Sequence, residues 1–128
     1  MPIVSLGMDL TQIDRMVEAH ERRGQRLLER VFTSEERAYC DRRKARFTHY
    51  AGRFAVKEAV MKVLGTGWRK GVRWVDIEVK RAPGEAPQVH LYGASAEIAR
   101  QRGIDRIHIT ITHDAGVAAA VAVAERDA

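Results

Sequence analysis

The segment from residue 49 to residue 64 constrains the fold more than any other part of the chain. Apolar side chains cover a wide face of this segment, so it predicts a helix buried in the core rather than one lying on the surface. Gly65 follows as a natural C-cap, and Gly65, Thr66 and Gly67 must then form a loop. A fold for this chain is therefore expected to be built around one long core helix.

The segments before this helix predict a strand followed by shorter helices. Residues 2–8 are apolar and rich in β-branched side chains, which is typical of a buried strand. Asp9 or Thr11 is expected to cap the helix that follows. Thr33 and Glu36 have the spacing of a capping box, so another helix is expected to begin there.

The second half of the chain alternates between apolar and polar residues, as strands with one buried face do. Two hairpins are expected, with a short helix between them at residues 95–102. Their strands are predicted at residues 72–80 and 88–92, and at residues 106–113 and 117–124. This order favours an α+β fold with an antiparallel sheet packed against the long core helix, and 128 residues favour a single domain over residues 1–128.

Positive charge is concentrated in one part of the chain. Residues 15–53 hold 11 bases and 6 acids, so this stretch alone equals the net charge of +5. One interpretation is a pair of solvated helices laced by salt bridges, and the other is a docking face for an anionic partner. Nucleic acid is one such partner, and a non-enzymatic basic nucleic-acid-binding module is the alternative function. The few aromatic residues in this stretch show no repeated interleaving, which disfavours it.

The cysteine content and the hydropathy of the chain limit the cellular compartments in which the protein is expected. Cys40 is the one cysteine, which excludes an internal disulfide framework and favours a reducing compartment. No apolar run approaches the roughly 20 residues of a membrane span, and the N-terminal residues lack the basic start of a signal peptide. A cytoplasmic protein without a membrane partner is expected.

Four charged residues interrupt the otherwise apolar core helix. Arg53 and Lys57 are four residues apart and share one face. Glu58 and Lys62 share the adjacent face in the same way. Burying such charges without partners is costly, so spacing alone favours an exposed stripe with a Glu58–Lys62 pair. Asp9, taken alone, is more typical of a helix cap than of a catalytic acid.

The end of the core helix has the character of a phosphate-binding corner. Small residues in the turn Gly65-Thr66-Gly67 let a ligand approach the backbone, and Lys62 stands one turn upstream. The residue order is not that of a Walker loop. The five histidines, of which His113 ends a predicted strand, show no spacing typical of a zinc site.

In their order and separation, these motifs resemble the holo-acyl-carrier-protein synthases, the small bacterial 4′-phosphopantetheinyl transferases. The resemblance covers nearly the whole chain and rests on G-x-D at residues 7–9, R-F-A-x-K-E-A-x-x-K at residues 53–62 and G-T-G at residues 65–67. Thr112 stands where the family often has Ser before the histidine, and the basic loop at residues 68–70 is less typical of it.

The resemblance implies transfer of 4′-phosphopantetheine from coenzyme A to a serine of an acyl carrier protein in fatty acid biosynthesis, with release of adenosine 3′,5′-bisphosphate. It also implies Mg²⁺ and a homotrimer with active sites between subunits. Asp9 and Glu58 would bind the metal, and Lys62 would stabilise charge on the phosphate. The serine proton would pass to Glu58 or to a water on the metal. The water is favoured, because a carboxylate that binds Mg²⁺ loses basicity.

The resemblance also implies a nucleotide site and a docking face. His113 would reach the 3′-phosphate from a neighbouring subunit, and Pro87 would line the adenine pocket. The residues expected to bind coenzyme A are Arg53, Lys57, Lys62, Gly65, Thr66, Gly67, Pro87 and His113. The residues expected to face the acidic carrier protein are Arg15, Arg22, Arg23 and Arg26.

Overall fold

The structure is a computed structural model that describes residues 2–67 and 70–127. Trp68 and Arg69, in the basic loop noted above, lie outside the described residues. In chain order the elements are β1 (Ile3–Gln12), α1 (Ile13–Arg23), α2 (Gln25–Val31), α3 (Ser34–Asp41), α4 (Arg46–Leu64), the 3₁₀ turn η1 (Trp74–Asp76), β2 (Ile77–Lys80), β3 (Gln88–Leu91), α5 (Gly93–Gln101), β4 (Arg106–Asp114) and β5 (Val117–Glu125).

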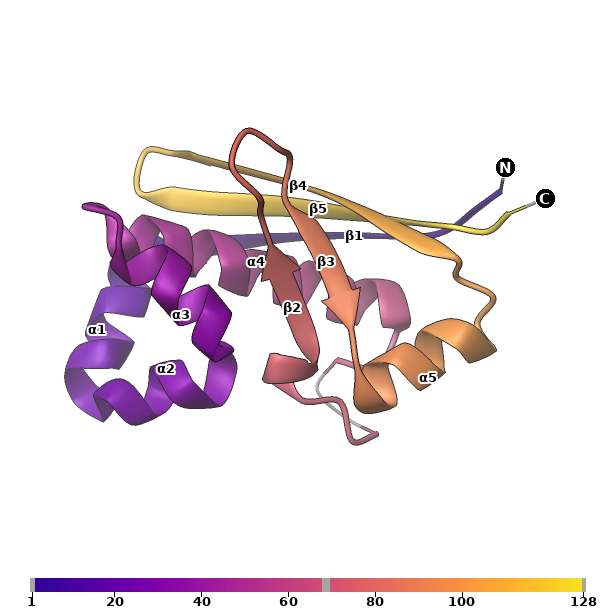
Figure 1. Ribbon diagram of the computed structural model, residues 1–128, viewed down its shortest axis with the longest axis horizontal. Helices are drawn as coiled ribbons and strands as arrows, with labels where there is room; N and C mark the ends of the chain where they lie inside the picture. The colour runs from indigo at the N-terminus through magenta and orange to yellow at the C-terminus, as the bar shows by residue number, and fades with distance from the viewer. Residues whose placement is uncertain (1, 68–69, 128) are drawn as a thin grey trace.

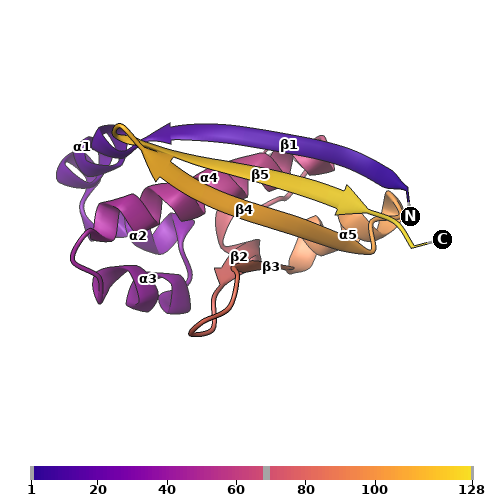
Figure 2. The same ribbon diagram turned by 90° about the horizontal axis from the view of Figure 1, so that it is seen from above.

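Two antiparallel sheets flank the long helix α4 (Figure 1). One has the strand order β1-β5-β4 and the other is the β2-β3 hairpin. The view from above shows β1, β5 and β4 side by side over α4, with α1, α2 and α3 gathered at one end (Figure 2). The prediction of an α+β fold with antiparallel strands and a long core helix is confirmed.

Helix α4 is the centre of the core, as its wide apolar face predicts. Val56, Val60 and Val63 are fully buried in it. They pack against the inner face of the sheet, where β5 contributes only alanines, which are small enough to let the helix lie close. The buried alanines of β5 are Ala118, Ala120, Ala122 and Ala124.

The outer face of the three-stranded sheet is apolar and open. Leu6, Met8 and Leu10 on β1 are 65%, 55% and 62% exposed. The prediction that residues 2–8 form a buried strand therefore holds for the inner face, where Gly7 is buried, and is wrong for the outer face. Successive side chains of a strand point to opposite faces, and α4 covers only one face of this sheet.

Other boundaries differ from the sequence expectation for local reasons. Asp9 and Thr11 do not cap a helix, because β1 continues through both and α1 begins at Ile13. Only the end of the predicted strand at residues 72–80 pairs as β2, and a 3₁₀ turn precedes it. The capping box of Thr33 with Glu36 is confirmed. Among the described residues, no helix combines the length and the apolar character that crossing a membrane requires.

Candidate active site

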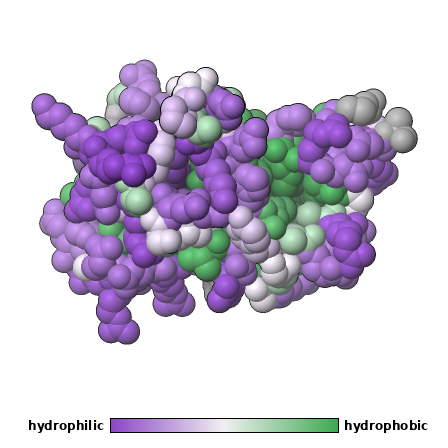
Figure 3. All heavy atoms as spheres, in the orientation of Figure 1, coloured by the Kyte–Doolittle hydropathy of each residue, from purple (hydrophilic) through white to green (hydrophobic). Residues whose placement is uncertain are grey.

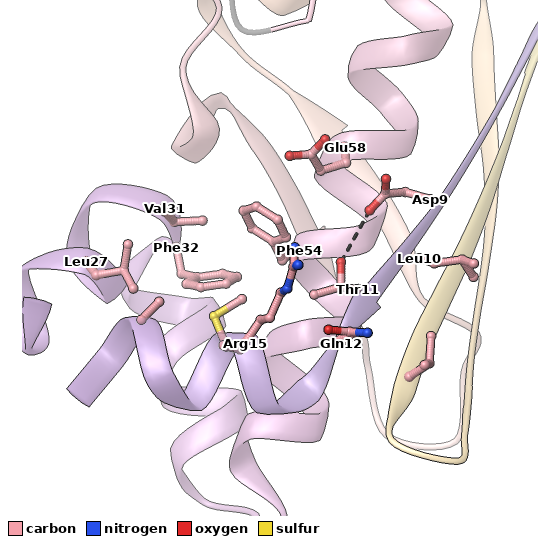
Figure 4. A pocket seen from close by; sticks show the side chains of 13 residues that line it. Asp9, Leu10, Thr11, Gln12, Arg15, Leu27, Val31, Phe32, Phe54 and Glu58 are labelled. Carbon is pink, nitrogen blue, oxygen red and sulfur yellow. Dashed lines mark hydrogen bonds between the residues drawn. The ribbon is translucent and has the colours of Figure 1, made fainter. Parts of the chain in front are cut away.

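Strand β1 and helix α4 bring Asp9 and Glu58 to the same pocket, which has a volume of about 580 Å³ (Figure 4). Asp9 lies on the inner face of β1, two residues after Gly7, where strand and helix meet most closely. A Cβ atom on Gly7 would stand 2.1 Å from the carbonyl oxygen of Ala59. The glycine therefore permits the contact that carries Asp9 to the helix.

The rest of this pocket is formed largely by α1 and α2. Thr11, Gln12 and Arg15 line it beside the two carboxylates, and Phe54 faces them from α4 (Figure 4). The pocket thus has a charged edge and an apolar interior. The other apolar lining residues are Leu10, Met16, Ala19, Leu27, Val31, Phe32 and Val117.

Lys62 joins the two elements from its half-exposed position on α4. Its Nζ atom donates to the carbonyl oxygen of Met8 at 2.7 Å and to Oδ1 of Asp9 at 3.3 Å. Within the described residues, its ion pair is with Asp9 rather than with Glu58. The stripe with a Glu58–Lys62 pair that spacing favours does not form, because β1 supplies a nearer acid.

The two carboxylates are close enough to affect each other. Partial burial raises the pKa of Glu58, the negative charge of Asp9 raises it further, and Lys62 opposes both effects. A cation between them would relieve this repulsion. Among the described residues, no group of three or more His, Cys, Asp and Glu side chains could hold a metal. Two carboxylates with open positions for water and phosphate fit Mg²⁺, which often takes only one or two protein carboxylates.

Lys57 is placed differently from the expectation that it faces a phosphate. Its side chain is fully buried, and its Nζ atom donates to Oε1 of Glu36 and to the carbonyl oxygen of Trp74, both at 2.9 Å, and to that of Ile77. All its donors are used inside the protein. The assignment of Lys57 to coenzyme A is therefore wrong, and the residue joins α4 to α3 and to the start of β2.

Arg53 and His113 line a second hollow of about 280 Å³, between α4 and β4. Arg53 is only 3% exposed, and its Nε atom is buried without a hydrogen-bond partner among the described residues. Arg81 lines the same hollow. The pKa of the neighbouring His49 is lowered by burial and then by the charges of Arg53 and Arg43. This concentration of positive charge around an unsatisfied donor is suited to an anion.

A third hollow, of about 400 Å³, shares Arg81 and extends the basic region toward the β2-β3 hairpin. Arg42 and Arg43 line it, together with residues 82–84 of the hairpin turn. Pro87 is not among its lining residues. The hairpin therefore reaches the basic region through an earlier part of its turn than expected.

The carboxylate pocket and the Arg53 hollow lie on opposite sides of one chain. Asp9 is on β1 and His113 is on β4, and β5 separates these strands. Gly65 ends α4 in the left-handed conformation, with φ of 77°. Beyond it, Thr66 and Gly67 continue the loop at the end of the helix remote from Arg53. None of the three hollows described above is lined by both Asp9 and His113.

The four arginines expected to dock a carrier protein lie on α1 and α2. Arg15 lines the carboxylate pocket, while Arg22, Arg23 and Arg26 are exposed. The ion pairs found among the described residues involve none of them. Figure 3 shows mostly hydrophilic side chains over the end formed by α1–α3. The interpretation of residues 15–53 as salt-bridged helices therefore does not hold for these four positions.

Sequence reasoning missed several residues that the structure places at these sites. Thr11 follows Asp9 by two positions, which on a strand puts both on one face. In the sequence, Phe54 stands only as one more apolar residue of the core helix. Arg81 and His49 lie far apart in the sequence from each other and from His113, so no local pattern joins them.

Comparison with known proteins assigns the fold and the motifs of this chain to the same family. A family model described as the 4′-phosphopantetheinyl transferase superfamily matches residues 5–122. A holo-[acyl-carrier-protein] synthase from Anaeromyxobacter sp. (strain K) is 48% identical over 126 residues, covering 96% of each chain.

Solved structures agree with this assignment. The crystal structure of a holo-[acyl-carrier-protein] synthase from Neisseria meningitidis has a TM-score of 0.89 and 26% identity, covering 98% of this chain and all of that one. The Helicobacter pylori enzyme, solved in complex with coenzyme A, has a TM-score of 0.81 and 33% identity, covering 94% and 99% of the two chains. This chain belongs to the 4′-phosphopantetheinyl transferase superfamily, in its family of holo-[acyl-carrier-protein] synthases.

Proposed function

We propose that this enzyme transfers 4′-phosphopantetheine from coenzyme A to a serine of an apo acyl carrier protein in a Mg²⁺-dependent reaction. The observation that carries the proposal is the convergence of Asp9 and Glu58 on one pocket, with Lys62 bonded to Asp9. The name of its relatives and the coenzyme A held by the Helicobacter pylori structure support the substrates.

The reaction exchanges one phosphorus–oxygen bond for another. The serine oxygen bonds to the phosphorus of the phosphopantetheine group, and the bond to the bridging oxygen of the pyrophosphate breaks. Adenosine 3′,5′-bisphosphate leaves with the bond's electrons. Bound Mg²⁺ supplies positive charge to the pyrophosphate. Lys62, on a flexible and half-exposed side chain, turns from Asp9 to the phosphate oxygens. The serine proton leaves through water beside Glu58.

The basic hollows supply a site for the nucleotide end of coenzyme A. Arg53 offers an unsatisfied buried donor, and His113 and Arg81 stand beside it. A 3′-phosphate would complete these donors with charge-assisted hydrogen bonds. Gly65, Thr66 and Gly67 remain assigned to the nucleotide, because their small side chains permit close approach of the backbone. Pro87, at the end of the hairpin turn, is assigned to the adenine.

A homotrimer with shared sites accounts for the separation of these two regions. Asp9 and His113 lie on opposite edges of the sheet, so the carboxylates of one subunit and the Arg53 hollow of the next can face one substrate. The outer face with Leu6, Met8 and Leu10 is the apolar surface that such an assembly would cover.

The exposed arginines on α1 and α2 are assigned to the carrier protein. Arg15 lies at the carboxylate pocket, and Arg22, Arg23 and Arg26 extend from it along the surface. An acidic carrier would be steered to this face with its serine toward Asp9 and Glu58. The buried thiol of Cys40 is compatible with the reducing cytoplasm as the place of action. Nucleic-acid binding would leave the carboxylate pocket without a role.

Variants of the two carboxylates test the proposal in a carrier mass-shift assay. Asp9→Ala and Glu58→Ala should lose turnover by at least about a hundredfold while their circular dichroism matches the wild type. Asp14→Ala is the matched control, since this acid is exposed on α1 and does not line the pocket. Wild-type rates in both pocket variants would reject the metal assignment.

A further inference from the structure

Thr11 forms a direct hydrogen bond to the carboxylate assigned to the metal. Its Oγ1 atom donates to Oδ2 of Asp9 at 3.2 Å (Figure 4). The other carboxylate oxygen, Oδ1, accepts from Nζ of Lys62 at 3.3 Å. Each oxygen of Asp9 thus has its own donor, and the two donors come from different elements of the fold.

The position of Thr11 makes this bond a fixed feature rather than a passing one. Thr11 is 9% exposed and pairs with Ala118 of β5, so its backbone is held within the sheet. Asp9 and Thr11 are two residues apart on the strand, which directs both side chains to the inner face. A β-branched side chain on a strand has restricted rotation about χ1, so the hydroxyl keeps its direction.

We propose that Thr11 is a positioning residue that fixes the Asp9 carboxylate in the orientation in which it binds the divalent cation. The inference rests on the proposed function, which makes Asp9 a ligand of that cation. The Nζ atom of Lys62 can leave Oδ1 of Asp9 to bind the phosphate. The hydroxyl of Thr11 is held on the strand and keeps its hydrogen bond to Oδ2 of Asp9. The hydroxyl therefore holds the plane of the carboxylate while Oδ1 becomes available to the cation.

The expected loss of metal affinity can be judged from other side chains that hydrogen-bond to metal ligands. Loss of such a group typically weakens metal binding or activity by roughly 10- to 100-fold. The Thr11 bond is long for two oxygen atoms, so we expect the lower end of this range. Thr11 touches neither the proton path nor the phosphate in this account, so the rate at saturating metal should change little.

Two substitutions separate the hydroxyl from the methyl group of Thr11. Thr11→Val keeps the shape and removes the hydrogen bond, whereas Thr11→Ser keeps the hydroxyl and removes the methyl group. Binding of Mn²⁺ is measured from the paramagnetic signal of the free ion, first with Mn²⁺ alone and then with coenzyme A added. Asp9→Asn is the reference for loss of the ligand, and melting curves establish that each variant is folded.

We expect Thr11→Val to weaken Mn²⁺ binding about tenfold and to raise the Mg²⁺ concentration for half-maximal turnover by the same factor, with kcat at saturating Mg²⁺ within twofold of wild type. Thr11→Ser should stay within twofold in both measurements. Wild-type affinity in Thr11→Val would overturn the inference, and so would an equal loss in Thr11→Ser, which would assign the effect to packing. If wild type and Asp9→Asn bind Mn²⁺ alike with and without coenzyme A, the metal assignment in the proposed function fails as well.

Discussion

Gly7 on β1 touches the backbone of Ala59 on α4, and there is no room for a side chain between them. A Cβ atom on Gly7 would lie 2.1 Å from the Ala59 carbonyl oxygen and 3.1 Å from Cγ2 of Val63. The backbone oxygen cannot move aside as a flexible side chain could. The glycine of the G-x-D motif therefore sets the distance at which Asp9, two residues later, meets Glu58 and Lys62.

Gly7→Ala should push β1 away from α4 and damage stability and turnover together. We expect a loss of roughly 3 kcal/mol in the free energy of unfolding, at the upper end for overpacking, and a strong loss of kcat. Urea unfolding and the transfer assay measure the two effects. Ser5→Ala, on the same face of β1, is the control and should change neither by much. An active and stable Gly7→Ala protein would show that the close approach is unnecessary.

Lys57→Met should destabilise the fold because it leaves the Glu36 carboxylate buried without its partner. Removing one member of a buried ion pair typically costs about 3–5 kcal/mol. Glu36→Gln/Lys57→Met removes both charges, but the single amide oxygen of glutamine can accept from only one of the backbone donors of Thr33 and Val79, which bond to different oxygens of Glu36. The double variant should therefore recover only part of that loss. Urea unfolding of both variants is the measurement. A Lys57→Met protein with wild-type stability and a weakened affinity for coenzyme A would restore the phosphate assignment.

Glu58→Gln should stabilise the metal-free protein near neutral pH. The pKa of Glu58 is raised by folding, so the folded state binds this proton more tightly than the unfolded state does, and stability falls as pH rises through that range. Glutamine removes the charge that causes the loss. Melting temperatures from about pH 4 to about pH 7 should show the variant gaining on the wild type as pH rises.

Added Mg²⁺ is the complementary arm of this experiment, because a cation that binds only the folded state raises its stability. It should raise the melting temperature of the wild type and not that of Glu58→Gln. A variant that melts below the metal-free wild type near neutral pH would contradict the destabilisation of the Glu58 carboxylate by burial and by the charge of Asp9.

Arg53→Met should weaken binding of coenzyme A through its 3′-phosphate. A hydrogen bond to a charged group contributes about 1.5–3 kcal/mol, so KM for coenzyme A should rise by roughly tenfold or more. Dephospho-coenzyme A lacks this phosphate, and with it the two proteins should differ little. Equal effects of Arg53→Met on both nucleotides would place the 3′-phosphate elsewhere.

Arg23→Glu tests the docking face in the same assay. It should raise KM for the carrier protein and leave KM for coenzyme A nearly unchanged.

The elements that the sequence predicts well are those with local causes. The capping box depends only on Thr33 and on Glu36 three positions later, and it forms as predicted. The hairpin of β4 and β5 follows from alternation around a short turn. The apolar pattern predicts the core helix from residue 49, whereas the helix begins at Arg46. The pattern misses the first turn because that turn is less apolar than the rest.

The predictions that failed depend on partners distant in the sequence. The four-residue spacing of Lys57 from Arg53 is typical of an exposed face. Lys57 is buried instead, because its Nζ atom donates to the buried carboxylate of Glu36, 21 residues away. Lys62 likewise pairs with Asp9, which lies 53 residues away, rather than with Glu58. The exposure of Leu6 could not be predicted from residues 2–8, because an apolar strand has the same sequence pattern whether its second face is covered or open.

Transfer itself is tested most directly by intact mass spectrometry of an apo acyl carrier protein incubated with this enzyme, coenzyme A and Mg²⁺. We predict that the carrier gains about 340 Da, the mass of one phosphopantetheine group. A chelator should abolish the gain, and excess Mg²⁺ should restore it. A carrier that keeps its apo mass in the presence of folded enzyme would contradict the account.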